Sequence, residues 1–151
     1  MNFKLKGVVV AAILCLGVGS VFAADCEVTI ESDDNMKFNL NEVVADKSCE
    51  KFTVTLKHVG SLPKNAMGHN WVLTKTSDFA GVAQDGGKAG LAQNYIKEGD
   101  SRVIAYTEII GGGETTSVTI DDLKSLTPGE DYSFFCSFLG HWSMMKGKFT
   151  Y

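Results

Sequence analysis

The chain has 151 residues, with 18 acidic and 14 basic side chains and a formal net charge of −4. This length suits one domain with its own hydrophobic core, and no repeat, low-complexity tract or proline-rich linker divides it. The acidic balance argues against a nucleic-acid-binding protein, because few cations could neutralise phosphates.

The first 23 residues have the pattern of a secretory signal peptide. Lys4 and Lys6 precede an apolar stretch over residues 7–18, and small residues lie at positions minus three and minus one of a cleavage point after Ala23. The apolar stretch is shorter than the roughly 20 residues that span a bilayer, which disfavours a membrane anchor. We therefore expect the protein to be exported.

Cleavage would leave a mature domain at residues 24–151, with a net charge of about −6 once the two leader lysines are lost. The alternative of a lipid anchor would make Cys15 the modified residue. The residues before it, Ala12-Ile13-Leu14, lack the usual Leu-small-small lead, which disfavours this alternative.

The mature domain has an odd number of cysteines, namely Cys26, Cys49 and Cys136. An unpaired thiol in an exported protein calls for an explanation. Cys26 and Cys49 both lie in the first quarter of the mature chain, so we expect them to form a disulfide that stabilises the fold by about 3 to 4 kcal/mol. A disulfide between Cys136 and one of the other two is the alternative.

Alternation of apolar and polar residues predicts mostly strands. Turn-forming residues separate the segments, for example Ser32-Asp33-Asp34-Asn35 and Gly111-Gly112-Gly113. About eight short strands of this kind predict an all-β antiparallel sandwich or barrel. The expected strands lie at residues 26–31, 38–44, 52–58, 70–74, 101–106, 115–120, 131–136 and 146–151.

Residues 77–97 do not fit the strand pattern. Phe79, Val82, Leu91 and Tyr95 are spaced as in one or two short helices, which glycines interrupt. We expect this segment to form a helical flap that packs outside the sheets.

The chain contains four side chains that could bind one metal ion. Cys136, His141 and Met145 follow a Cys-x4-His-x3-Met spacing, and Gly68-His69 lies upstream. This donor set contains one thiolate, two imidazoles and one thioether. An ordinary structural zinc site has more thiolates than this, whereas soft sulfur donors combined with imidazoles favour copper. If these side chains converge, the protein binds one copper ion.

Strand parity indicates that the donors point inward. Tyr132, Phe134 and Cys136 would share one face of a strand, as would His69 with Trp71 and Leu73. In the last strand, Met145 rather than Met144 falls on the apolar face. His58 also has inward parity, so we expect a buried histidine with a structural role.

The segments Gly68-His69-Asn70 and Cys136-Ser-Phe-Leu-Gly-His141-Trp-Ser-Met-Met145 resemble the copper-binding pattern of the cupredoxin family. The pair Cys26 and Cys49, the run from Leu62 to Trp71 and the helical flap narrow this resemblance to the azurins. It covers nearly the whole mature chain. It implies a cupredoxin-like Greek-key β-sandwich of about eight strands, and a periplasmic type 1 (blue) copper protein that transfers single electrons by Cu(I)/Cu(II) cycling rather than an enzyme.

The resemblance also implies residue roles. His69, Cys136 and His141 would be the trigonal ligands, with Met145 and the carbonyl of Gly68 on the two axes. Asn70 would tie the ligand loops together, and the Phe138 N–H would donate to the cysteine sulfur. His141 would reach the surface within an apolar docking patch formed by Met36, Leu62, Ala66, Met67, Phe138 and Leu139.

Many azurins have proline where this chain has Leu139, so the ligand loop could be looser here. The implied partners are c-type cytochromes and periplasmic oxidoreductases of the nitrite reductase or amine dehydrogenase type, with the protein itself a monomer. Copper storage or delivery is the alternative function, but the methionines are scattered rather than clustered. Catalysis would need an open coordination position, and no histidine is left to build a second site.

Overall fold

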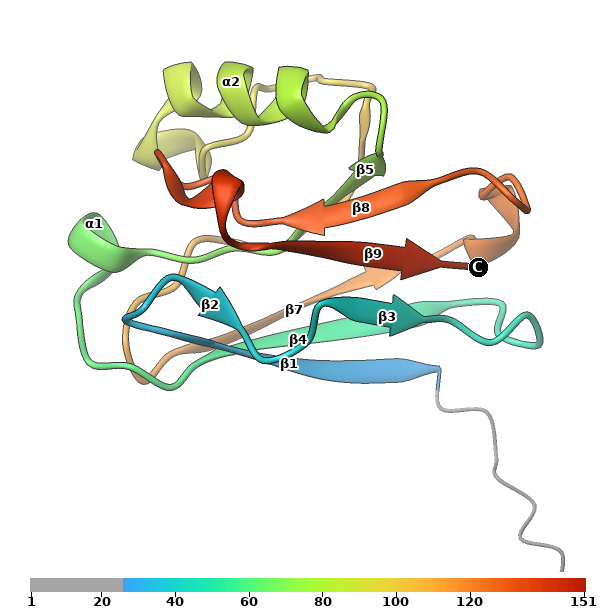
Figure 1. The fold of residues 1–151 in the computed structure, drawn as a ribbon, viewed down its shortest axis with the longest axis horizontal. Coiled ribbons are helices and arrows are strands. Elements are labelled where there is room, and N and C mark those ends of the chain that lie inside the picture. Colours follow the sequence, from blue (N-terminus) through green and yellow to red (C-terminus); the bar gives the residue numbers. More distant parts are fainter. Residues whose placement is uncertain (1–25) are drawn as a thin grey trace, which may run out of the picture.

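The computed structural model describes residues 26–151, and the expected leader at residues 1–23 lies outside them. Strands dominate this part of the chain, as predicted (Figure 1). The strands are β1 (Glu27–Asp33), β2 (Lys37–Phe38), β3 (Glu42–Val44), β4 (Phe52–His58), β5 (Val72–Lys75), β6 (Val103–Tyr106), β7 (Thr115–Ile120), β8 (Tyr132–Phe135) and β9 (Lys146–Thr150). The helices are α1 (Lys64–Met67), α2 (Phe79–Ala89) and the 3-10 turns η1 (Leu91–Gln93), η2 (Leu123–Ser125) and η3 (His141–Ser143).

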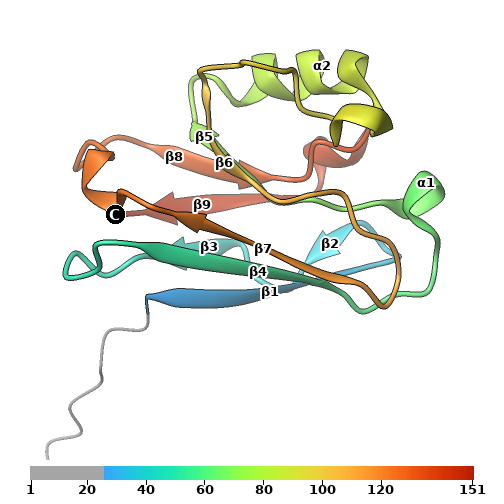
Figure 2. The ribbon, with the colours of Figure 1, turned by 180° about the vertical axis from the view of Figure 1, so that it is seen from behind.

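The strands form two sheets that pack face to face, in the orders β2-β1-β4-β7 and β3-β9-β8-β5-β6 (Figures 1 and 2). The predicted sandwich is therefore confirmed. The expectation that it is wholly antiparallel is wrong, because β1 pairs with β4, and β3 with β9, in parallel. The chain crosses to the second sheet through β3 before it returns to the first as β4. Strands joined by such a crossover can run in the same direction.

The expected single strand over residues 38–44 is split between the two sheets. Asn39 still belongs to the first sheet, because its N–H donates to the carbonyl of Glu31 at 2.9 Å. The carbonyl of Asn41 already belongs to the second, because it accepts from the N–H of Lys148 at 2.9 Å. The chain thus changes sheets within three residues, which raises the number of strands to nine among the described residues.

The core lies between the sheets and follows the predicted parity. Trp71 stacks on Phe134 with ring centroids 5.9 Å apart, and both side chains are fully buried. Just before β9, Met145 is fully buried whereas Met144 is 59% exposed, as expected from the alternation. Inward-facing residues of both sheets therefore form one apolar layer, whose buried members include Ile30, Val54, Leu56, Leu73 and Phe149.

The predicted helical flap is confirmed at α2 and η1, which lie outside the second sheet (Figures 1 and 2). A separate apolar cluster joins α2 to the outer face of this sheet through Val82, Ala83 and Phe135. Phe79 at the start of α2 makes an edge contact with the ring of Trp142, 5.6 Å between centroids. The flap is thus packed against the segment that carries His141.

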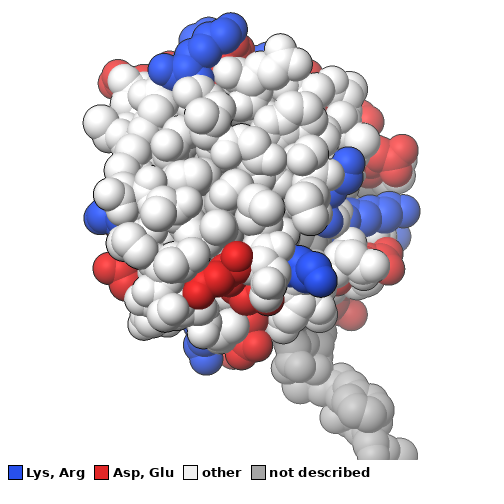
Figure 3. Space-filling model, turned by 60° about the vertical axis from the view of Figure 1, so that its left-hand side comes forward, with Lys and Arg blue, Asp and Glu red and all other residues white. Residues whose placement is uncertain are grey.

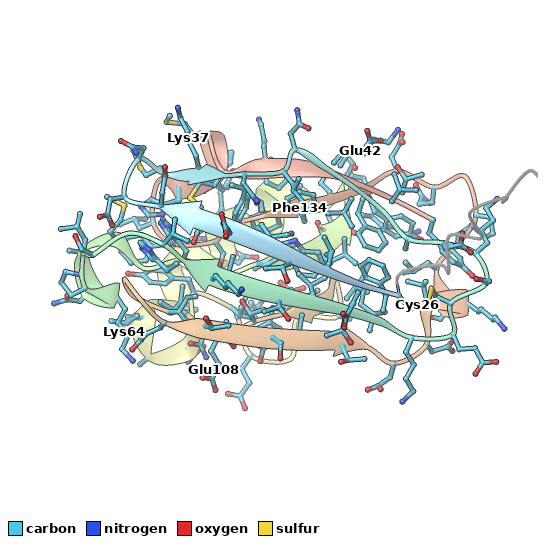
Figure 4. All side chains as sticks on the ribbon, turned by 90° about the horizontal axis from the view of Figure 1, so that it is seen from below. Cys26, Lys37, Glu42, Lys64, Glu108 and Phe134 are labelled. Carbon is cyan, nitrogen blue, oxygen red and sulfur yellow. A yellow bond between two sulfur atoms is a disulfide. The ribbon has the colours of Figure 1, made fainter. Side chains whose placement is uncertain are left out.

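Cys26 and Cys49 form a disulfide, and Cys136 is a free, buried cysteine. The predicted pairing is confirmed and the alternative that involved Cys136 is excluded. Figure 4 places Cys26 at the end of the sandwich opposite to Lys64 of α1. No helix between residues 26 and 151 is long and apolar enough to cross a membrane.

Candidate metal centre

Cys136, His69 and His141 converge at one end of the sandwich, close to α1. The Cys136 sulfur lies 3.8 Å from Nδ1 of His69 and 3.7 Å from Nδ1 of His141. The two Nδ1 atoms are 3.3 Å apart. Within residues 26–151 these three form the group of potential donors whose ligand atoms come within 4.8 Å of one another. One ion could contact all three atoms.

The ends of the second sheet hold these donors in place. His69 precedes β5 and exchanges two backbone hydrogen bonds with Ile110, at 3.0 and 2.9 Å. Cys136 directly follows β8, and its N–H donates to the carbonyl of Met145 at 3.0 Å. This bond extends the β8–β9 ladder and brings Met145 beside Cys136, with which it shares a buried cluster. All four predicted donor side chains therefore lie in one region.

The carbonyl of Gly68 also faces the centre, with its oxygen 3.9 Å from the Cys136 sulfur. Only glycine fits here, because a Cβ on Gly68 would collide with the carbonyl oxygen of Lys64 and would approach Cγ2 of Ile109 to 2.7 Å. The close packing lets the backbone itself approach the donor cluster.

The ring of His69 directs a lone pair toward the cluster. Nε2 of His69 lies 2.9 Å from the carbonyl oxygen of Asp33, so it carries the proton and leaves Nδ1 as the acceptor. Burial lowers the pKa of His69 to about 4, and burial likewise lowers the pKa of His141 to about 4. Both imidazoles are therefore neutral at pH 7, which is the form that binds metals.

Cys136 needs a cation to ionise. Burial raises the pKa of its thiol to about 12, although the backbone N–H groups of Asn70 and Phe138 donate to the sulfur and oppose this rise. A thiolate at this position would lie in a fully buried site, where an uncompensated negative charge is costly. Binding of a metal ion would supply the compensating charge and release the proton.

Asn70 connects the segments that carry His69 and Cys136. Its Oδ1 accepts from the N–H of Ser137 at 2.8 Å, and its Nδ2 donates to Oγ of Ser137, also at 2.8 Å. A second bond from Nδ2 reaches the carbonyl of Asn94 at 2.9 Å. Both Asn70 and Ser137 are fully buried. Fully satisfied polar networks of this kind fix the relative position of the segments they join.

His58 is buried and has a structural role, as predicted. Its ring stacks on His69 at 4.5 Å between centroids. Nε2 lies 2.9 Å from the carbonyl oxygen of Met67, and Nδ1 accepts from the N–H of Gly60 at 3.0 Å. Both ring nitrogens are occupied, so His58 supports the ring of His69 and is not part of the donor cluster.

The surface over this end of the molecule is largely uncharged. Figure 3 brings the end that carries α1 forward and displays a broad area free of Lys, Arg, Asp and Glu. Leu62 is 40% exposed and Leu139 is 67% exposed. Of the three clustered donors only His141 keeps measurable exposure, at 4%. The predicted patch residues Met36, Leu62, Ala66, Met67 and Leu139 are exposed or half-buried here, whereas Phe138 is buried.

Two residues that support the site, Asn94 and Trp142, were not predicted to do so from the sequence. Asn94 in the flap holds both Asn70 and the N–H of Ile109, yet no spacing rule relates it to the donors. Trp142 follows a predicted ligand, and its packing on Phe79 depends on where the flap lies. The apolar spacing of the flap, which includes Phe79, was the one sequence feature that could have indicated a packing partner for Trp142.

The donor chemistry fits copper. Two neutral imidazoles and a thiolate, with a thioether beside them, combine ligands that suit both Cu(I) and Cu(II). A structural zinc site would normally have four firm tetrahedral ligands. All three clustered donors are buried, which suits a resident ion.

Comparisons with known proteins agree with this chemistry. The family model of copper-binding proteins of the plastocyanin/azurin family matches residues 24–151. Azurin of Achromobacter denitrificans is 66% identical over 127 residues, which cover 84% of this chain and 85% of that protein. Azurin of Pseudomonas chlororaphis is 61% identical over 124 residues, covering 82% and 96%. The solved structure of azurin Az-iso2 from Methylomonas sp. strain J superposes with a TM-score of 0.80 at 46% identity, covering 84% of this chain and 98% of that one.

Proposed function

This chain belongs to the plastocyanin/azurin family of copper-binding proteins, and we propose on that basis that it is a blue-copper protein that carries single electrons between redox partners. The observation that carries the proposal is the buried group of His69, Cys136 and His141, whose ligand atoms already lie within 4.8 Å of one another. Bound copper would supply a one-electron couple between Cu(I) and Cu(II).

The arrangement of the side chains supports these ligand roles. His69, Cys136 and His141 would hold the ion, because their donor atoms are mutually closest. Met145, which shares a buried cluster with Cys136, and the carbonyl of Gly68 would be weaker contacts. The soft sulfur donors favour Cu(I), whereas the imidazoles suit both oxidation states.

The contribution of the protein is to keep these donors fixed. Asn70 and Ser137 join the segments that carry His69 and Cys136, and His58 supports the His69 ring from behind. The N–H groups of Asn70 and Phe138 donate to the Cys136 sulfur and reduce its negative charge. A site preorganised in this way needs little rearrangement when the charge of the ion changes, which favours rapid electron transfer.

Electrons would enter and leave through the edge of His141. This ring is 4% exposed. Figure 3 shows a broad uncharged surface at the end of the molecule that carries α1. Leu62 precedes α1, Ala66 belongs to it and Leu139 lies two positions before His141, and all three are exposed. A small apolar surface suits brief association with redox proteins. The partners that fit this role are c-type cytochromes and periplasmic oxidoreductases of the nitrite reductase or amine dehydrogenase type, with the protein acting as a monomer and not as an enzyme.

We assign the protein to the periplasm, with residues 1–23 as a cleaved signal peptide and residues 24–151 as the copper-binding domain. The disulfide between Cys26 and Cys49 supports this assignment, because disulfides persist in oxidising compartments. The N-terminal pattern of lysines, apolar residues and a small-residue cleavage site supports it as well.

Visible absorption tests the function directly. The mature domain, residues 24–151, is loaded with Cu(II) and titrated with a one-electron reductant and then an oxidant. We expect an intense blue band that disappears and returns with one electron per chain. A colourless protein that binds Cu(I) and passes it readily to a chelator would instead support copper storage or delivery, and would overturn the electron-carrier proposal.

A further inference from the structure

We propose that Asn94 is a positioning residue that couples the helical flap to the metal centre. The inference rests on the proposed function, since it concerns the same site. Asn94 follows η1 and is half-buried between the flap and the ligand segments. Its hydrogen bonds go to neighbours of the donors and not to the donor atoms, so its effect must pass through the residues that it holds.

Asn94 joins two separate segments of the site. Its carbonyl oxygen accepts from Nδ2 of Asn70 at 2.9 Å, which continues the network from Asn70 to Ser137. Its side-chain Oδ1 accepts from the N–H of Ile109 at 3.0 Å. One flap residue thus holds Ile109 and also Asn70, which follows His69 and is bonded to Ser137 next to Cys136.

The hydrogen bond to Ile109 matters because Ile109 and Ile110 contact two predicted ligands, Gly68 and His69. Ile110 is paired with His69 by two backbone hydrogen bonds. The side chain of Ile109 packs so closely against Gly68 that a Cβ on that glycine would come within 2.7 Å of it. If the Ile109 N–H loses its acceptor, the support for Gly68 and His69 loosens.

The backbone at Asn94 is unusual in a way that indicates a functional constraint. Asn94 and Tyr95 have successive positive φ angles of 53° and 54°. Asparagine tolerates this left-handed conformation, but it is unfavourable for tyrosine, whose side chain crowds the backbone there. The corner presses the Tyr95 carbonyl against α2, where a Cβ on Gly86 would collide with it.

The strained corner directs an aromatic ring toward the ligand loop. The ring of Tyr95 lies 4.8 Å from that of Phe138, and Phe138 lies 4.5 Å from the ring of His141. Asn94 therefore contacts one ligand segment by hydrogen bonds and sets the backbone that packs against the other. Loss of the corner would disturb the N–H groups that donate to the Cys136 sulfur.

Three substitutions separate the side-chain bond from the backbone conformation. Asn94→Gly keeps the left-handed conformation but removes the acceptor, Asn94→Ala removes both, and Asn94→Asp keeps both. The first readout is alkylation of Cys136 by iodoacetamide in the metal-free domain, because this thiol is fully buried and reacts only when the site opens. Loss of one partly buried hydrogen bond should accelerate alkylation about five- to tenfold in the Gly and Ala variants.

Rescue by aspartate distinguishes positioning from general packing. The Asn94→Asp variant should react within about twofold of the unsubstituted domain, since the Ile109 N–H keeps an acceptor. Equal alkylation rates for Asn94→Gly and the unsubstituted domain would overturn the proposal. If neither Gly nor Ala variant folds, slow hydrogen exchange of the Ile109 amide in the unsubstituted domain tests the same bond, and rapid exchange there would overturn it.

Asp85→Asn is the matched control. Asp85 anchors α2 through an ion pair with Arg102 at 2.7 Å and also pairs with Lys88 at 3.2 Å, and both partners lie outside the ligand segments. This variant should weaken the flap without accelerating alkylation of Cys136. If it accelerates alkylation as much as Asn94→Gly does, general flap stability explains the effect and the positioning role fails.

The reduction potential gives a second readout that a merely structural role would not change. Weaker N–H donation to the sulfur favours the oxidised ion, so Asn94→Gly should lower the potential. A threefold change in the ratio of Cu(I) and Cu(II) affinities corresponds to ~30 mV at 59 mV per tenfold. An unchanged potential would count against the coupling. Failure of the copper-loaded protein to turn blue would instead refute the electron-carrier function, and the metal-free alkylation series would still decide the role of Asn94.

Discussion

His69 and His141 lie 72 positions apart in the chain, yet their Nδ1 atoms are 3.3 Å from each other in a buried site. Burial lowers the pKa of both rings to about 4, and two protonated rings at this distance would also repel each other. The folded chain therefore keeps both imidazoles neutral near pH 7 before any metal binds. The fold itself thus prepares the lone pairs for a cation.

The stability of the metal-free domain should fall as the pH decreases from about 6.5 to about 4. Burial lowers the pKa of both histidines to about 4, so between these limits the unfolded chain binds more protons than the folded one. Each histidine can contribute on the order of 3 kcal/mol to the loss. Urea denaturation at a series of pH values measures it. His141→Asn should make the decline shallower, and a flat profile in the unsubstituted domain would contradict the expectation.

Cys136→Ser should abolish the intense blue absorption. The hydroxyl occupies a similar position but does not form a soft, charge-donating bond to copper as a thiolate does. The variant should still fold, because the N–H groups that donate to the sulfur can donate to the hydroxyl oxygen. Visible spectroscopy of the Cu(II)-loaded variant checks the prediction, with circular dichroism as the control for folding. A variant that remained intensely blue would show that Cys136 is not the ligand responsible.

Local patterns were sufficient where the outcome depends on parity. Alternation in the last strand predicted that Met145 rather than Met144 points inward. In the structure Met145 is fully buried and Met144 is 59% exposed. The same argument placed Trp71 and His58 inside. A side chain in a strand has only two choices of face, so a short apolar pattern decides between them.

Long-range relationships could not be read from the same patterns. The parallel pairing of β1 with β4 depends on the path of the chain through the other sheet. The crossover between Asn39 and Asn41 lies within residues 38–44, which were predicted as a single strand. Asn94 acts through hydrogen bonds to residues 24 and 15 positions away, and no sequence rule relates these positions.

Asn70→Ala should destabilise the domain by about 2–4 kcal/mol, because the substitution leaves the buried N–H of Ser137 without an acceptor. Ser137→Ala is the milder comparison, since it removes the hydroxyl but keeps the bond from the Ser137 N–H to Oδ1 of Asn70. We expect it to cost about 1 kcal/mol. Chemical denaturation of the metal-free variants measures both. Equal losses of stability in the two variants would indicate that the hydrogen bond from the Ser137 N–H to Asn70 is not the main contribution of Asn70.

Replacing both Cys26 and Cys49 by alanine should lower the unfolding free energy by about 3 kcal/mol, since the disulfide closes a loop with a sequence separation of 23. The spectrum of the copper-loaded protein should be unchanged, because the bridge lies at the end opposite to α1 and the donor cluster (Figure 4). Denaturation and visible absorption measure the two effects separately. A shifted blue band would mean that strain passes along the sandwich to the site.

Leu139→Lys should slow electron transfer with redox partners and self-exchange by at least about tenfold, because a charge in the uncharged surface must be desolvated whenever a partner docks. Leu139 is 67% exposed, so the substitution should cost little stability. Val44→Lys is a matched control, since Val44 is 66% exposed but pairs with Thr150 at the far end of β9. Stopped-flow kinetics with a c-type cytochrome, and self-exchange followed by line broadening, measure the rates. If both lysine variants slow transfer equally, net charge rather than the surface around His141 controls docking, and the proposed route for the electron would have to be abandoned.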